Sequence, residues 1–143
     1  MPSRSASRAE NELASKLWER GYLVVRAAAS GSGLRERFQP DLVAAKDGVI
    51  VIIEVKSLNR KGALYVRTEQ VKGLKDLRER SGGFAFIAVR LRGGDWRFHS
   101  VDELREVSKR SYRLDDPEKG LRLRDVDELL LKKSRRISEF FQL

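Results

Sequence analysis

The sequence contains no cysteine and a single histidine, His99. Without cysteine the chain cannot form disulfides, thiolate nucleophiles, iron–sulfur clusters or cysteine-based zinc sites. One histidine leaves little scope for a metal site of several histidines or for a serine–histidine catalytic pair. The uninterrupted apolar runs, such as Val49–Ile53, are far too short to span a bilayer. Since no apolar signal sequence opens the chain either, we expect a cytoplasmic protein with no membrane partner.

Acidic residues are in short supply relative to basic ones. The chain has 30 Lys and Arg against 21 Asp and Glu, which gives a formal charge of +9 at pH 7. This balance favours a polyanionic partner such as DNA, RNA or anionic lipid, although some basic proteins bind none of these. Hydrophobic residues make up 41% of the 143 residues, which excludes a disordered basic tail. The length fits one domain with its own core.

Hydrophobic periodicity predicts an α/β protein with a central mixed five-stranded sheet flanked by helices. We expect one domain over residues 1–143, in which residues 102–143 form a C-terminal helical extension. Residues 102–121 are charged and should be irregular, with a short helix near Leu104. Thr68 is the predicted cap of the second helix. The predicted elements are a helix that ends before Gly21, strands over 22–28, 42–45 and 49–56, a helix over 68–80, strands over 84–91 and 96–101, and an amphipathic helix over 125–141.

The register of one hairpin brings two acidic residues together. Asp47-Gly48 is a strong two-residue turn signal, and such a turn pairs Lys46 with Val49. Asp41 then lies directly opposite Glu54, with the two Cβ atoms roughly 4.5–5.5 Å apart. Lys56 projects from the same face as Glu54 because side chains alternate along a strand.

Like charges placed opposite each other destabilise a sheet, so this pair calls for a functional reason. Two carboxylates at one sheet end suit Mg²⁺ or Mn²⁺, which prefer hard oxygen ligands. Taken singly, each residue also has a structural explanation, as a turn aspartate or a surface ion pair.

Glu10 has two interpretations that the residues alone leave open. It lies on the core-facing stripe of the first predicted helix with Leu13 and Leu17, where a carboxylate needs a partner. It also completes a capping box with Ser7, in which it would bond back to the backbone at the helix start.

The order of these motifs resembles that of a nuclease family. Pro40-Asp41 followed by Glu54-Val55-Lys56 is the degenerate pattern of restriction-endonuclease-like nucleases. The fuller order resembles the archaeal Holliday junction resolvases of the Hjc type, over about residues 8–98 and more loosely in the C-terminal helix. The motifs that carry the resemblance are Ala9-Glu10-Asn11-Glu12-Leu13, Gly21-Tyr22 with Val24-Val25-Arg26 and Ser30, Pro40-Asp41-Leu42-Val43-Ala44, Ile53-Glu54-Val55-Lys56-Ser57, Tyr65-Val66-Arg67 with Glu69-Gln70, Phe86-Ile87-Ala88-Val89, and Trp96 with Phe98.

The resemblance implies roles for individual residues. Glu10, Asp41 and Glu54 would be metal ligands for Mg²⁺, for which Mn²⁺ would substitute. Lys56 would position or polarise the attacking water and the phosphate. Ser30 matches a family serine close to the scissile phosphate, although Ser32 lies near enough to leave that assignment open. The family also implies a homodimer, whose two identical sites would make two symmetric cuts.

Basic residues gather in sequence around these acids, between the first predicted strand and the second helix. Arg26 also matches a basic family position near the DNA backbone. Contacts to phosphates of this kind supply affinity without reading base sequence. The basic residues expected to face DNA are Arg26, Arg35, Arg37, Arg60, Lys61, Arg67, Lys72 and Lys75.

Three further features have structural explanations. His99 should be an ordinary strand residue. Trp96 and Phe98 should lie in the core or in a dimer interface, since they project from one side of a strand. Gly31-Ser32-Gly33 lacks the following Gly-Lys-Ser/Thr of a nucleotide-binding P-loop, so nucleotide binding is not expected there.

The sequence therefore predicts a metal-dependent endonuclease that acts on four-way DNA junctions in the cytoplasm, at the nucleoid. A nuclease of the same fold acting on other branched DNA is the first alternative. A non-catalytic basic module that binds nucleic acid is the second. Other recombination proteins are possible partners, but no motif identifies one.

Overall fold

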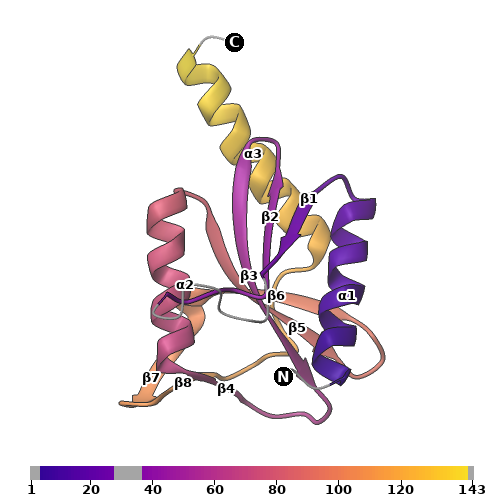
Figure 1. The fold of residues 1–143 in the computed structure, drawn as a ribbon, viewed down its shortest axis with the longest axis vertical. Coiled ribbons are helices and arrows are strands. Elements are labelled where there is room, and N and C mark those ends of the chain that lie inside the picture. Colours follow the sequence, from indigo (N-terminus) through magenta and orange to yellow (C-terminus); the bar gives the residue numbers. More distant parts are fainter. Residues whose placement is uncertain (1–3, 28–36, 142–143) are drawn as a thin grey trace.

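The computed structural model describes residues 4–27 and 37–141, with the side chains of residues 4–7 excepted. Runs of strands separate its three α-helices along the chain (Figure 1). In chain order they are α1 (Arg4–Glu19), β1 (Leu23–Arg26), β2 (Leu42–Lys46), β3 (Val49–Leu58), β4 (Leu64–Arg67), α2 (Thr68–Ser81), β5 (Phe84–Leu91), β6 (Trp96–Ser100), a 3₁₀ turn (Val101–Glu103), β7 (Arg105–Ser108), β8 (Ser111–Leu114) and α3 (Leu123–Phe141).

The central sheet has five strands in the order β1–β2–β3–β5–β6. All neighbouring pairs are antiparallel except β3 and β5, which run parallel and are joined through α2. Val51, Ile52 and Ile53 of the middle strand β3 are buried because helices cover both faces of the strand there. The predicted mixed five-stranded α/β sheet is confirmed.

The tight turn between β2 and β3 has the predicted form. Asp47 and Gly48 both have positive φ angles, 54° and 76°, as a two-residue hairpin turn of the primed type requires. Lys46 pairs with Val49 and Leu42 with Ile53, so the predicted register is confirmed.

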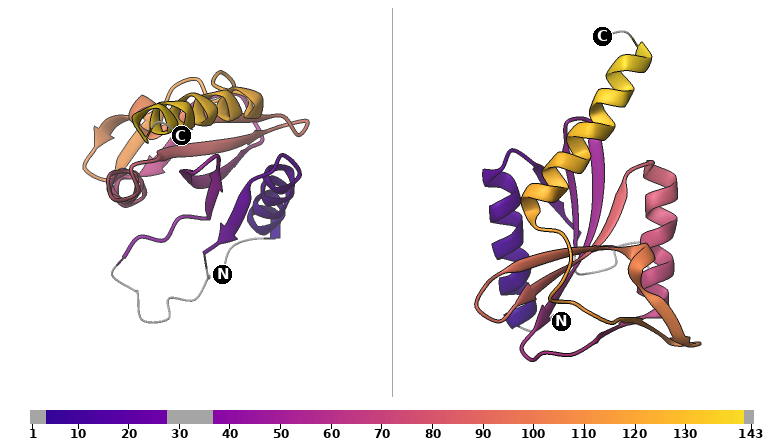
Figure 2. Two further views of the ribbon diagram at one scale, coloured as in Figure 1. Left: turned by 90° about the horizontal axis from the view of Figure 1, so that it is seen from above. Right: turned by 180° about the vertical axis from the view of Figure 1, so that it is seen from behind.

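The two faces of the sheet are covered by different helices. One core cluster joins Leu13 of α1 and Leu130 of α3 to Ile53 and Phe98 of the sheet. The other cluster joins Leu74 of α2 to the opposite face. Trp96 and Phe98 are buried in the first cluster, so they belong to the core. The views from above and from behind show α3 crossing the sheet on the side away from α2 (Figure 2).

A second, three-stranded sheet in the order β4–β8–β7 corrects the expectation that residues 102–121 are irregular. The helix expected near Leu104 is only the 3₁₀ turn Val101–Glu103. All four residues of β7 are exposed, so this strand lacks the apolar alternation by which the other strands were recognised. Its pairing with β8, and that of β8 with β4, holds it in place.

Two predicted helix starts are also corrected. α1 begins at Arg4, so Ser7 lies inside the helix and cannot be the cap of a capping box with Glu10. α2 follows directly from β4, with Arg67 at the cap position and no side-chain cap. The Thr68 backbone N–H instead donates to the Arg110 carbonyl, 3.0 Å away, while its buried hydroxyl has no partner among the described residues.

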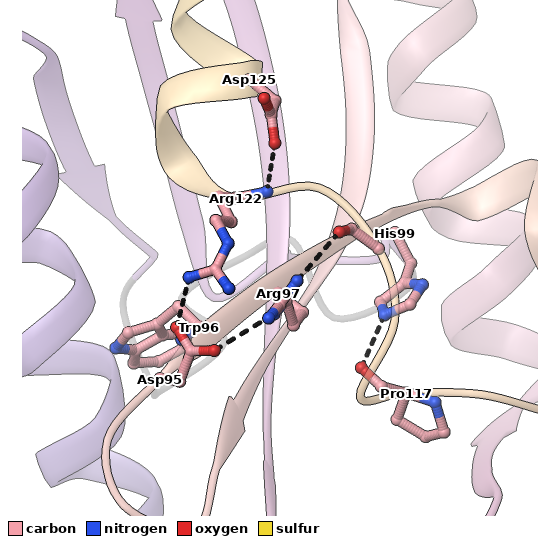
Figure 3. Close-up of polar contacts among 8 residues, drawn as sticks. Asp95, Trp96, Arg97, His99, Pro117, Arg122 and Asp125 are labelled. Atoms are coloured by element: carbon pink, nitrogen blue, oxygen red, sulfur yellow. Dashed lines mark hydrogen bonds and ion pairs between the residues drawn. The ribbon is translucent and has the colours of Figure 1, made fainter.

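The segment before α3 is fastened to β6 (Figure 3). His99 is buried in β6, as expected of a strand residue, and its Nε2 lies 2.9 Å from the Pro117 carbonyl oxygen. Leu121 pairs with Phe98 through two backbone hydrogen bonds.

The first half of α3 packs on the sheet, whereas its last turns extend beyond the body and expose Phe140 and Phe141 (Figure 1). Within the described ranges, no helix is long and apolar enough to cross a membrane.

Candidate active site

Asp41 and Glu54 face each other where β2 begins, on the side of the sheet that α2 covers. Each carboxylate accepts a backbone hydrogen bond from the other strand. The Val55 N–H donates to Asp41 Oδ2 at 2.8 Å, and the Asp41 N–H donates to Glu54 Oε1 at 3.1 Å. Glu54 is only 3% exposed. The hairpin register thus delivers the acidic pair that the sequence predicts.

The surroundings of Glu54 oppose its ionisation. Burial, followed by the adjacent Asp41 carboxyl, raises the pKa of Glu54 from 4.5 to about 8, while the Lys56 charge acts in the opposite direction. At neutral pH without a cation, the pair therefore retains a proton. A divalent cation held by the two carboxylates would offset their repulsion and displace the proton.

Lys56 joins the pair through a side chain of α2. Its ammonium group donates to Gln70 Oε1 at 3.0 Å, and Gln70 Nε2 donates to Glu54 Oε2 at 2.8 Å. The structure thus links Glu54, Gln70 and Lys56 in one hydrogen-bonded chain. Sequence reasoning gave Gln70 no role, because only the packing of α2 over β3 reveals this contact.

Glu10 lies outside this chain of contacts. Its carboxylate binds Arg26 at 2.6 Å, and Arg26 also donates to Asn11. Among the described residues, no three acidic or histidine side chains come together in a way that could hold a metal ion. Glu10 as a third metal ligand stays a prediction.

The two carboxylates that do meet fit a Mg²⁺ ion. Magnesium is commonly bound through one or two carboxylates, with waters and substrate phosphates completing its shell. Asp41 and Glu54 supply such a pair at the end of a buried sheet face. This arrangement can bind a hard cation beside a phosphate, with the Lys56 ammonium on the same face.

The other predicted contacts divide between described and undescribed residues. Ser30, Ser32 and Arg35 lie outside the described residues. The remaining basic residues come from the loop before β2, the loop after β3, β4 and α2. Those with exposed side chains are Arg37, Arg60, Lys61, Arg67 and Lys72, and Lys75 is half-buried.

A family model and the sequences of known proteins both match this chain to one family. The family model of the archaeal Holliday junction resolvase (Hjc) matches residues 1–135. The crossover junction endodeoxyribonuclease Hjc of Sulfurisphaera tokodaii is 37% identical over 141 residues, which cover 97% of this chain and 96% of that protein. Its namesake from Sulfolobus acidocaldarius is 37% identical over 123 residues, covering 85% and 82% of the two chains.

Two solved structures resemble this one. That of Archaeoglobus fulgidus Hjc, a Holliday junction resolvase, superposes with a TM-score of 0.71 at 28% identity, covering 84% of this chain and 98% of that one. A bacterial homing endonuclease has a TM-score of 0.52 at 18% identity, covering 98% and 99% of the two chains, and that likeness concerns the fold alone.

Proposed function

The chain belongs to the archaeal Holliday junction resolvase family, and we propose that it resolves four-way DNA junctions by paired, symmetric hydrolysis of phosphodiester bonds. Its fold is restriction-endonuclease-like, as the resemblance implied. The observation that carries the proposal is the facing Asp41 and Glu54 pair with Lys56 on the same face of the sheet. A resolvase acts where the chromosome lies, so we place the protein in the cytoplasm at the nucleoid.

We propose Mg²⁺ as the cofactor, with Mn²⁺ able to substitute. When bound, a divalent cation would supply an activated water and stabilise charge on the phosphoryl oxygens. Asp41 and Glu54 would hold the cation. Lys56 would place its positive charge where negative charge grows in the transition state. For Glu10 to serve as the third ligand, its carboxylate has to leave Arg26, and a DNA phosphate is the natural new partner for Arg26.

We propose that the active form is a homodimer. A four-way junction requires two cuts related by symmetry, and a two-fold dimer offers two identical sites. Three apolar side chains of β1 and β3, Leu23, Val25 and Ile50, are exposed. Register places them on the same face of the sheet as Val43 and Ile52, and thus as the pair itself. Pairing of this apolar patch between two copies would bury it and give each half of a symmetric dimer one acidic pair.

Cleavage of an immobile four-way junction tests the proposed function. Wild-type protein should produce paired, symmetric nicks with Mg²⁺ and none with EDTA. Asp41→Asn should abolish cleavage yet spare or tighten junction binding, because it removes negative charge beside the phosphate. Linear duplex and flap DNA with the same arms are the control substrates.

Each other result points to a different function. Equal cleavage of flap and junction DNA would favour a nuclease for branched DNA in general. Tight junction binding without cleavage in Mg²⁺ or Mn²⁺ would indicate a DNA-binding module. Cleavage that survives Asp41→Asn would reject the assigned site.

A further inference from the structure

We propose that Gln70 is a positioning residue, whose amide holds the Lys56 ammonium beside Glu54 in the geometry that cleavage requires. This inference rests on the proposed function and adds a residue to its site. The supporting observation is the pair of hydrogen bonds from one amide group, to Lys56 Nζ at 3.0 Å and to Glu54 Oε2 at 2.8 Å.

The chemistry of the two partners fixes the orientation of the amide. A lysine ammonium can only donate hydrogen bonds, so it requires the amide oxygen as its acceptor and leaves the amide NH2 group to donate to a carboxyl oxygen. Gln70 must therefore present its oxygen to Lys56 and its nitrogen to Glu54. An amide offers both functions at once, whereas a carboxylate offers only acceptors to both partners. The site thus specifies glutamine chemically as well as by size.

A neutral partner also preserves the charge of Lys56. Lysine has a flexible stem, so its ammonium needs a fixed acceptor to stay in one place. A carboxylate acceptor would neutralise the ammonium and compete with a phosphate for it. The Gln70 amide oxygen holds Lys56 without adding a negative charge, which leaves the full positive charge for the substrate.

The position of Gln70 is rigid. It lies in the first turn of α2, directly after β4, where the Thr68 N–H donates to the Arg110 carbonyl of the second sheet. The next inward residues of α2, Val71 and Leu74, are fully buried against the central sheet. The second sheet and the helix core therefore hold the amide over β3.

Gln70→Met tests the inference because methionine has a similar length and forms neither hydrogen bond. At saturating junction and Mg²⁺, we expect the single-turnover cleavage rate to fall roughly 10–100-fold, as for residues that orient metal-site groups. Junction affinity in EDTA and the unfolding temperature should remain those of the wild type. Glu79→Met, which introduces the same side chain at an exposed position of α2, should cleave at the wild-type rate.

A double-mutant cycle distinguishes positioning from a purely structural role. In a Lys56→Met background, Gln70→Met should change the residual rate by less than about threefold, because both substitutions disable the same unit. Independent, multiplicative effects would overturn the inference. If Gln70→Met does not fold, Gln70→Glu keeps the size of the side chain and should still lose at least about tenfold, because it loses the donor to Glu54.

The outcomes separate this inference from the proposed function. Wild-type cleavage together with undiminished cleavage by Gln70→Met would overturn the role of Gln70 and leave the resolvase function standing. A wild-type protein that does not cut junctions would overturn the proposed function, and the role of Gln70 with it.

Discussion

The buried Glu54 carboxyl makes the stability of the metal-free protein depend on pH. Without a cation, the folded protein keeps a proton on Glu54 up to about pH 8, whereas the unfolded chain releases it near 4.5. The contribution of this carboxyl to the free energy of unfolding is fully present below pH 4.5. It is lost as the pH rises towards 8, because the unfolded state then binds fewer protons than the folded state. The carboxyl group that would bind a metal therefore destabilises the metal-free protein at neutral and higher pH.

Glu54→Gln should remove this pH dependence. In EDTA, the wild-type free energy of unfolding should gain a downward slope between about pH 4.5 and 8, of at most about 1.4 kcal/mol per pH unit for one proton. The variant should be more stable than wild type at pH 8 and similar to it at pH 4. Urea unfolding at several pH values measures this, with Glu79→Gln as the control. Parallel curves for wild type and Glu54→Gln would contradict the assigned environment of Glu54.

The site residues differ in how far the sequence could predict them. Asp41, Glu54 and Lys56 follow from one turn and the alternation of a strand, both of which are local. Glu10 had two interpretations, and the structure excludes the capping box but pairs Glu10 with Arg26. Gln70 could not be derived, because its contacts depend on how α2 packs over β3.

At the scale of elements, the parallel pairing of β3 and β5 depends on a close backbone contact between the turn after α2 and β3. Gly82 ends the helix with a φ of 70°, and a Cβ on Gly83 would lie 1.9 Å from the Ile50 carbonyl oxygen of β3. The absence of a side chain at Gly83 lets β5 enter the sheet directly beside β3. This entry in turn places α2, and with it Gln70, over the acidic pair.

Gly83→Ala should therefore destabilise the protein markedly. We expect a loss at the upper end of the roughly 1–3 kcal/mol typical of overpacked sites, because backbone has to move. Gly82→Ala is the comparison, since its Cβ would meet no atom within 4 Å and only the left-handed backbone carries a penalty, about 1 kcal/mol. Thermal or urea unfolding of both variants measures the difference, and equal losses would argue against the close approach.

The elements that the sequence predicted share a visible apolar pattern. Four strands of the central sheet, β2, β3, β5 and β6, contain buried residues, and β1, although mostly exposed, begins with three apolar residues. The second sheet escaped prediction because β7 is wholly exposed and because β4 pairs only with β8, in a segment whose sequence predicts no strand. These strands form because segments distant in the sequence pair with each other, and a local sequence pattern does not predict such pairing.

At the scale of the whole molecule, the apolar patch predicts how two copies associate. We expect the protein to sediment as a dimer, and Leu23→Lys combined with Val25→Lys to sediment as a 16.4 kDa monomer with unchanged secondary structure. The monomer should lose paired cleavage of a junction and leave single nicks. Trp18→Lys is the control, because Trp18 is equally apolar and exposed but belongs to α1. If only that variant dissociates, the interface lies on α1 instead.

The joint burial of α1 and α3 also governs when the chain can fold during its synthesis. Asp127 of α3 binds both Arg20 and Tyr22, and Leu130 completes the core that Leu13 begins. Contacts so distant in sequence form late and slow folding. The acidic pair leaves the ribosome early, but the opposite face of the sheet is covered only by α1 until α3 has emerged. The complete core on this face is therefore reached only once α3 has emerged and packed beside α1 on the sheet.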